Sequence, residues 1–102
     1  MRRAARIDAN HAAIVNTLRK CGCEVQSLAA CGQGVPDALV YHRATNRLML
    51  VEIKDGTKSP SKRRLTPDQI AWHARWPVAV VTSANDVPGL LGAEFAQLLD
   101  SF

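Results

Sequence analysis

Residues 36–54 read PDALVYHRATNRLMLVEIK, from Pro36 to Lys54, and the rest of the chain is organised around them. Two apolar runs of strand length flank the polar residues 43–46, whose side chains are typical of turns, so the stretch predicts a β-hairpin. Two registers are open at this point. Either all four polar residues form the loop, or Thr45 and Asn46 alone form a two-residue turn.

Both registers bring two carboxylates together. In the first register Asp37 lies directly opposite Glu52, and in the second the two residues lie one diagonal step apart. Side chains alternate along a strand, so both carboxylates occupy the same face in either case. At a separation of about 5 Å they repel each other, and a chain that keeps such a pair is expected to hold a cation there.

A hard divalent cation such as Mg²⁺ suits an all-oxygen site of this kind, which water and substrate phosphate would complete. The backbone carbonyl of Ile53 is a further candidate ligand. Lys54 shares the face of Glu52 and would stand near an attacking water or a transition-state phosphate oxygen. A lone Glu-x-Lys is more often an ordinary solvated strand end, but the upstream Pro36-Asp37 and the shared face favour the metal site.

The composition indicates one small globular domain. The chain has 102 residues, of which 47% are hydrophobic, and its formal net charge is +4. This length leaves room for one modest core, so we expect a single domain over residues 1–102, with residues 1–6 as a flexible basic arm. No apolar run approaches the ~18 residues of a membrane span, which favours a cytosolic protein. Cys21, Cys23 and Cys31 fit no common zinc spacing and predict buried or partly buried free thiols.

Positive charge is concentrated in residues 54–64. This segment carries five Lys or Arg side chains and Asp55, and its net charge of +4 equals that of the whole chain. Such a run is usually a solvated loop, but beside two carboxylates it is better interpreted as an electrostatic footprint for phosphates. Its Ser, Pro and Gly content suggests that it orders on binding. The candidate nucleic-acid contacts here are Lys58, Ser59, Lys62, Arg63 and Arg64.

A glycine-punctuated loop at residues 31–34 leads into Asp37. Glycine adds no side chain, so the backbone at Gln33 and Gly34 is expected to approach a phosphate closely. A simple turn is the alternative interpretation. The position of the loop immediately before Asp37 favours the contact with phosphate.

A helix and a strand are predicted before the hairpin. Asp8 is a plausible N-cap for a helix over about residues 9–20, where apolar side chains recur at helical spacing. Gly22 marks the end of this helix. Residues 24–29 then have the pattern of a first strand.

Two helices and a strand are predicted after the hairpin. Thr66 caps a helix that has Pro67 at its first position. A β-branched strand covers residues 77–82, and a last helix opens at residues 86–88. Its apolar residues are Leu90, Leu91, Phe95, Leu98 and Leu99. The order αβββαβα predicts an α/β sheet flanked by helices.

Two patterns predict which parts of this sheet are buried. The strand over residues 47–54 is apolar on both faces, which predicts a central strand covered on both sides. Trp72 and Trp76 share one helix face with Gln69, and we expect both rings to anchor the core rather than to stack on bases.

The segments Gly34-Val35-Pro36-Asp37 and Val51-Glu52-Ile53-Lys54 together resemble the motif of the PD-(D/E)XK nuclease superfamily. The surroundings are similar to the small stand-alone VRR-NUC type of phages and prophages, and to archaeal Holliday junction resolvases. Residues 65–72 are similar to the family's helix that carries a glutamine after the active strand. The resemblance spans roughly residues 8–83.

The resemblance implies a restriction-endonuclease-like core, a homodimer, and a cytoplasmic location in a bacterium or a phage-infected host. It also places Gln69 near the active site. On the first helix many relatives carry an acidic or amide residue facing the metal, and the usual glutamate position aligns here with His11. Asn10 and His11 are therefore the candidates for this site, and His11 is either a helix-surface histidine or a contact to phosphate or to a metal-bound water.

We expect a metal-dependent DNA endonuclease that hydrolyses phosphodiester bonds, with branched or structured DNA as substrate. Asp37 and Glu52 would hold Mg²⁺, or Mn²⁺ in its place, and Lys54 and Gln69 would complete the catalytic set. The alternative is a catalytically inactive nucleic-acid-binding module that keeps the fold, which the missing acid on the first helix favours. A small-molecule enzyme fits the charged loop poorly.

Overall fold

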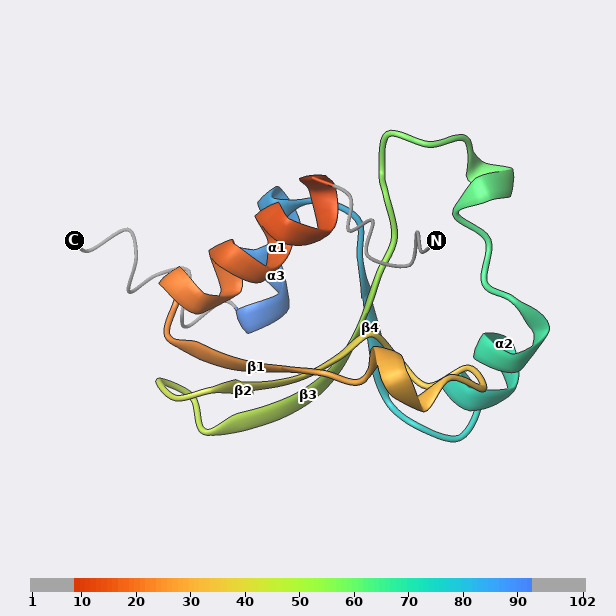
Figure 1. The fold of residues 1–102 in the computed structure, drawn as a ribbon. Coiled ribbons are helices and arrows are strands. Elements are labelled where there is room, and N and C mark those ends of the chain that lie inside the picture. The colour runs from red at the N-terminus through yellow and green to blue at the C-terminus, as the bar shows by residue number, and fades with distance from the viewer. Residues whose placement is uncertain (1–8, 93–102) are drawn as a thin grey trace.

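The computed structural model describes residues 9–92, which form a mixed α/β fold around one four-stranded sheet (Figure 1). The strands lie in the order β1-β2-β3-β4, and β4 is parallel to β3 whereas the other neighbours are antiparallel. The strands are β1 (Cys23–Ser27), β2 (Ala38–His42), β3 (Arg47–Ile53) and β4 (Val78–Val81).

Within residues 9–92, three α-helices accompany the sheet: α1 (Ala9–Lys20), α2 (Pro67–His73) and α3 (Val87–Leu91). Helices α1 and α3 lie together on one side of the sheet, whereas α2 lies beyond the strand ends at the right of Figure 1. The element order agrees with the predicted αβββαβα. Within the described residues, no helix has both the length and the apolar character that a membrane crossing requires.

Some predicted boundaries move by a few residues. The first strand ends at Ser27 rather than Ala29, because a 3₁₀ turn over Ala29–Cys31 (η1) replaces its last residues. Two further 3₁₀ turns are present. The turn η2 (Pro60–Lys62) lies in the positively charged segment of residues 54–64, called the basic loop below, and η3 (Ala84–Asp86) precedes α3. The arm over residues 1–6, the N-cap at Asp8 and the apolar positions Phe95, Leu98 and Leu99 fall outside the described residues.

The hairpin adopts the register with a four-residue loop. Ala38 pairs with Val51 and His42 with Arg47, so one step further the ladder sets Asp37 opposite Glu52. Asn46 closes the loop with a left-handed backbone (φ 55°), a conformation that Asn tolerates better than most residues. The hydroxyl of Tyr41 donates to Oδ1 of Asn46 at 2.9 Å, which fastens the loop to β2.

The core lies between the inner face of the sheet and helices α1 and α3. Alternate residues of β2 and β3 point inward, and each buried aliphatic side chain contributes about 1.5–3 kcal/mol relative to exposure. The central buried side chains are Ile14, Leu18, Val40, Met49, Val51, Val81, Val87 and Leu91. Packing against these two helices fixes the position of β3, and with it the C-terminal end of β3, where Glu52 lies.

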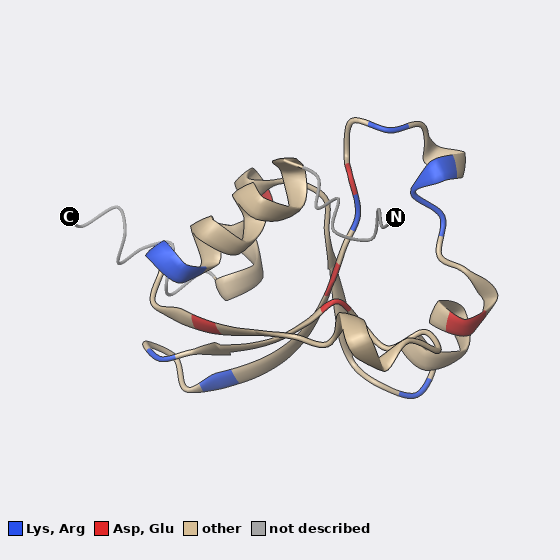
Figure 2. Cartoon of the chain, in the orientation of Figure 1, with Lys and Arg blue, Asp and Glu red and all other residues tan. Residues whose placement is uncertain are grey.

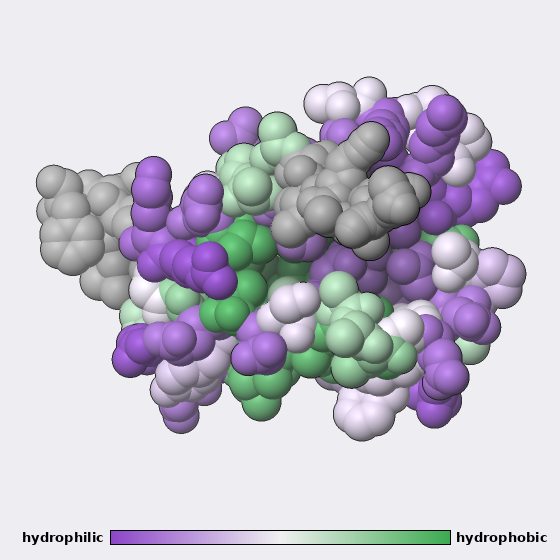
Figure 3. Space-filling view, viewed as in Figure 1, coloured by the Kyte–Doolittle hydropathy of each residue, from purple (hydrophilic) through white to green (hydrophobic). Residues whose placement is uncertain are grey.

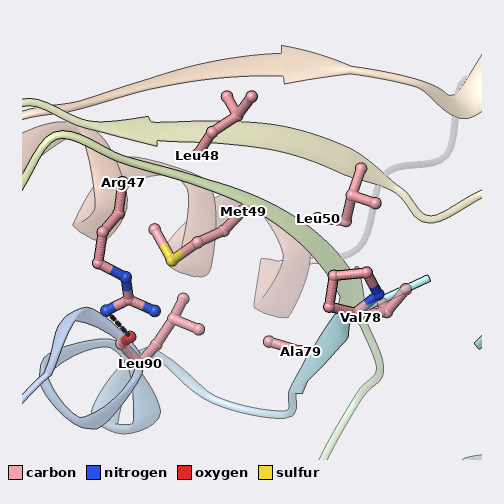
Figure 4. A pocket seen from close by; sticks show the side chains of 8 residues that line it. Arg47, Leu48, Met49, Leu50, Val78, Ala79 and Leu90 are labelled. Atoms are coloured by element: carbon pink, nitrogen blue, oxygen red, sulfur yellow. Dashed lines mark hydrogen bonds between the residues drawn. The ribbon is translucent and has the colours of Figure 1, made fainter.

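The outer face of the sheet is exposed, which corrects the prediction that β3 is covered on both sides. Leu48 is 68% exposed and Val80 is 46% exposed. Among the described residues the helices α1 and α3 pack on one face only, and α2 does not extend over the middle of the other. A hollow of about 340 Å³ opens beside Leu48, Leu50 and Val78, and Nη1 of Arg47 donates to the carbonyl of Leu90 at its edge, at 3.3 Å (Figure 4).

The prediction that both tryptophans anchor the core is also wrong. Helix α2 ends at His73, so Trp76 lies beyond it rather than on its face. The rings of Trp72 and Trp76 stack with centroids 4.9 Å apart, and 48% of Trp76 is exposed.

The cysteines are free thiols, as predicted. Burial, followed by the neighbouring Cys21, raises the pKa of Cys23 to about 11, so this thiol is unreactive near neutral pH. Cys21 is half-buried, but Cys31 is exposed, contrary to the expectation of burial, because it lies on the η1 turn outside the sheet.

Candidate active site

Asp37 is held at the start of β2 by the backbone around it. Its carbonyl accepts a hydrogen bond from the backbone N–H of Leu28 at 2.8 Å. Its Oδ2 accepts another from the backbone N–H of Ile53 at 2.7 Å, across the hairpin. The register and the pleat therefore place this carboxylate beside Glu52, at the exit of β3.

Glu52 is a buried carboxylate, with only 3% of the residue exposed. Its Oε2 accepts from Nε2 of Gln69 at 3.0 Å and lies 3.5 Å from Nζ of Lys54. Its Oε1 is also buried, and no amide, ammonium or hydroxyl group of the described residues donates to it. A buried carboxylate oxygen without a donor is costly, and it marks a place for a cation or a proton.

The environment of Glu52 favours its protonated form. Burial raises the pKa of Glu52 to about 7, and the negative charge of Asp37 and a hydrogen bond between the two carboxyl groups act in the same direction. The charge of Lys54 lowers this pKa but does not outweigh burial. The two carboxyl groups therefore share a buried site that disfavours two negative charges.

Gln69 joins helix α2 to this pair. The sequence Thr66-Pro67-Asp68-Gln69 forms a capping box, in which the side chain of Gln69 accepts from the backbone N–H of Thr66 at 2.9 Å. The same Oε1 accepts from Nζ of Lys54 at 3.0 Å, while Nε2 donates to Glu52. One side chain thus caps the helix and orients both charged groups.

Asn10 ties the start of α1 to the exits of β3 and β4. Its Nδ2 donates to the carbonyl of Lys54 at 3.0 Å and to that of Thr82 at 3.2 Å. This amide nitrogen therefore fixes the backbone of Lys54 relative to α1 and to the end of β4. Sequence reasoning placed Asn10 near the site but missed this role, because the contact joins segments that are distant in the chain.

Two further candidates, the backbone of Ile53 and the side chain of His11 on α1, also lie near the carboxylates. Ile53 contributes its N–H to Asp37, and ligation by its carbonyl stays a prediction. His11 lines a groove between α1 and β1 that reaches Asp37.

The basic loop rises from β3 next to the carboxylates, and Figure 2 shows positive segments along this loop and acidic segments where it leaves β3. Lys58, Ser59, Lys62 and Arg64 are exposed, and Nε of Arg63 donates to the carbonyl of Lys58 at 2.8 Å. Within residues 9–92 the side-chain ion pairs are Arg43–Glu24 and Lys54–Glu52. The four cations beyond Lys54 therefore form no ion pair with the described acidic residues.

Gly34 has a structural reason to be glycine. Its φ is +84°, and a Cβ at this position would lie 2.4 Å from the backbone oxygen of Asp68. The neighbouring Gln33 also has a left-handed backbone, at φ 57°. The loop is therefore shaped by its close approach to the start of α2, and a phosphate contact at these two residues stays a prediction.

The described residues bring together no group of three or more His, Cys, Asp or Glu side chains that would hold a metal. A cation here would thus have two carboxylates as its side-chain ligands. Mg²⁺ commonly binds in this way, through one or two carboxylates together with water and substrate phosphate.

Scans against protein-family models, curated proteins and solved structures each found no match for this chain. The resemblance of the motifs to the nuclease superfamily therefore stays a prediction.

Proposed function

We propose that this chain is a metal-dependent DNA endonuclease that hydrolyses phosphodiester bonds. The observation that carries the proposal is the pair Asp37 and Glu52 on facing strand ends. One buried oxygen of Glu52 receives no hydrogen bond from any amide, ammonium or hydroxyl group of the described residues. The agreement of the element order with the predicted restriction-endonuclease-like core supports the same conclusion.

The donor set fits a hard divalent cation. Asp37 and Glu52 would hold Mg²⁺ or Mn²⁺, with the carbonyl of Ile53 as a further ligand. Such a cation would satisfy the buried oxygen and offset the burial and the repulsion from Asp37 that raise the pKa of Glu52. When bound, it supplies Lewis-acid activation of water and of the phosphate.

Lys54 and Gln69 perform the remaining tasks. Lys54 lies next to the carboxylates, where its ammonium group positions the attacking water or offsets the negative charge that develops on the phosphate. Gln69 fixes Lys54 and Glu52 relative to each other through one hydrogen bond to each. Preorganisation of this kind lowers the cost of reaching the transition state.

The basic loop supports nucleic acid as the substrate class. Cations that form no ion pair with the described acidic residues, next to a candidate phosphate-cleaving site, fit a polyanion better than a small metabolite. The resemblance to small VRR-NUC enzymes and junction resolvases favours branched or structured DNA, and a cytoplasmic location in a bacterium or an infected host cell.

We also propose that two copies associate into a homodimer. Leu48 and Val80 are exposed on the outer face of the sheet, and Trp76 lines one hollow together with Leu48. Exposed apolar surface of this kind often marks an interface. A two-fold dimer needs one self-complementary patch, and it would present two active sites to the two strands of a duplex or branch.

Cleavage assays test the activity directly. Wild-type protein is incubated with four-way junctions, flaps, nicked duplexes and linear DNA, with Mg²⁺, Mn²⁺ or EDTA. We expect metal-dependent cleavage that Asp37→Asn and Glu52→Gln abolish. Wild-type-like cleavage by either variant would remove the metal-site assignment.

The alternative is an inactive DNA-binding module, which the two-carboxylate ligand set favours. A calorimetric titration with Mn²⁺ separates the two functions. Metal binding that both carboxylate variants lose supports the nuclease, whereas DNA binding without any metal binding supports the inactive module.

A further inference from the structure

A second groove begins at the candidate active site and lies between α1 and β1. Its volume is about 290 Å³, and Asp37 stands at the end that meets the site. Figure 3 shows apolar surface between α1 and the sheet, with hydrophilic side chains on either side of it. The residues that matter for its chemistry are His11, Val15, Asn16, Arg19, Val25 and Asp37.

The wall that α1 contributes follows one stripe of the helix. His11, Val15 and Arg19 are spaced four residues apart, so they lie one above the other, and Asn16 stands beside them. Val15 and Val25 give the groove an apolar surface, while the histidine, the asparagine and the arginine supply hydrogen-bond donors. A nucleotide strand needs this combination, because its sugars and bases are partly apolar and its phosphates accept hydrogen bonds.

The charges along the molecule agree with this interpretation. Figure 2 shows positive residues in the basic loop, acidic residues in the centre and positive residues again at the end of α1, with one further acidic segment on β1 below that end. The last turn of α1 carries Arg19 and Lys20. Phosphates on both sides of a central, cation-bound phosphate would therefore meet positive charge.

We propose that this groove binds the DNA strand on one side of the phosphate that is held at Asp37 and Glu52, with Arg19 contacting a phosphate of that flank. The inference rests on the proposed function and deepens it. His11 and Arg19 are eight residues apart, which is about 12 Å along a helix. At about 3.4 Å per nucleotide, the groove accounts for three or four nucleotides of the strand.

A charge-matched pair of variants tests this assignment. Arg19→Glu and Lys20→Glu change the net charge equally at adjacent exposed positions, but only Arg19 lines the groove. DNA affinity is measured with Ca²⁺ in place of Mg²⁺, on the DNA that wild-type protein cleaves best. Because a hydrogen bond between charged groups is lost, we expect Arg19→Glu to weaken binding by roughly tenfold more than Lys20→Glu. Thermal melts confirm that both variants fold.

A length series locates the contact on the strand. The cleavage position is mapped, and each flank is then shortened one nucleotide at a time. For wild type and Lys20→Glu, affinity should fall once one flank is shorter than about four nucleotides, and Arg19→Glu should lose this dependence.

The outcomes separate the groove from the activity. Equal weakening by the two variants, or equal dependence on both flanks, with cleavage intact, overturns the groove and leaves the proposed function standing. Wild-type protein that neither cleaves nor binds any DNA removes the proposed function and this inference with it.

Discussion

The side chain of Gln69 donates from Nε2 to Oε2 of Glu52 at 3.0 Å, while its Oε1 accepts from Nζ of Lys54 at 3.0 Å. The same Oε1 closes the capping box of α2 at Thr66. The start of a short helix is thereby coupled to the two charged groups of the candidate active site. Helix stability and site geometry depend on one residue here, and variants can separate the two effects.

The first prediction separates capping from catalysis at Gln69. Thr66→Ala removes the side-chain cap of α2 but leaves the contacts of Gln69 with Glu52 and Lys54, so it should lower the free energy of unfolding by about 1 kcal/mol with turnover nearly unchanged. Gln69→Ala should cost similar stability and lower turnover as well. Urea unfolding and single-turnover cleavage measure the two effects, and equal turnover in both variants would limit Gln69 to a helix cap.

The second prediction follows from the raised pKa of Glu52, which is about 7 in the fold and 4.5 as the ordinary value. Between these pH values the folded state holds a proton that the unfolded state has released. The free energy of unfolding of metal-free protein should therefore fall as pH rises from about 4.5 to 7, by at most about 1.4 kcal/mol per pH unit, and then level off.

Glu52→Gln provides the control for this pH dependence. This variant has no carboxyl group at position 52, so the fall in the free energy of unfolding between about pH 4.5 and 7 should disappear. The variant should also be more stable than wild type at pH 8 without metal. Because a cation must displace the proton, Mn²⁺ should bind wild type more tightly at pH 8 than at pH 6. Urea unfolding in EDTA at several pH values decides the matter, and a flat profile for wild type would refute the burial of an uncompensated carboxyl pair.

The third prediction concerns Lys54. Loss of one preorganised charge at the transition state typically lowers the rate by about 10²- to 10³-fold. Lys54→Ala should therefore slow single-turnover cleavage by this factor and change DNA affinity little. Lys58→Ala serves as the control, since Lys58 is exposed in the loop and should mainly affect binding. The reverse pattern in the two variants would make Lys54 a simple phosphate contact.

The fourth prediction tests the dimer. A charge within the exposed apolar face should prevent association, so Leu48→Glu should sediment as a monomer at concentrations where wild type is a dimer. Ile70→Glu is the matched control, because Ile70 is 56% exposed but belongs to α2, which lies beyond the strand ends. A monomeric wild-type protein, or equal masses for wild type and Leu48→Glu, would contradict the assignment of the interface.

Local rules were sufficient to predict the hairpin and its carboxylates. Strand alternation places Asp37 and Glu52 on one face in either register, and the capping sequence at Thr66 predicts the start of α2. The register itself depended on Asn46 adopting a left-handed backbone, which a periodicity argument does not determine.

Features that depend on the packing of distant segments could not be predicted. The exposure of Leu48 reflects where the helices lie relative to the sheet, and the half-exposed Trp76 reflects how early α2 ends. The bond from Asn10 to the carbonyl of Lys54 spans 44 residues of sequence. The sequence indicated this hydrogen bond only through a polar residue, Asn10, at the start of a predicted helix. Polar residues are common at that position whether or not they contact a distant strand.

The last prediction concerns the basic loop. Lys62 and Arg64 are exposed, Arg63 is partly so, and none of the three forms an ion pair with the described acidic residues. If they contact phosphates, each contact releases counterions, and the slope of log affinity against log salt is roughly −0.9 per contact on duplex DNA. Replacing all three with alanine should flatten this slope by about two to three units.

The loss of affinity should be similar for different DNA sequences, because phosphate contacts position the duplex without reading its bases. Folding stability should change little, since exposed charges contribute little to it. Binding is measured at several salt concentrations with Ca²⁺ in place of Mg²⁺. Arg43→Ala is the control, because Arg43 lies in the hairpin loop and pairs with Glu24 of β1. An unchanged slope in the triple variant would mean that the segment is a solvated loop, and Arg2, Arg3 and Arg6 would be the next positions to replace.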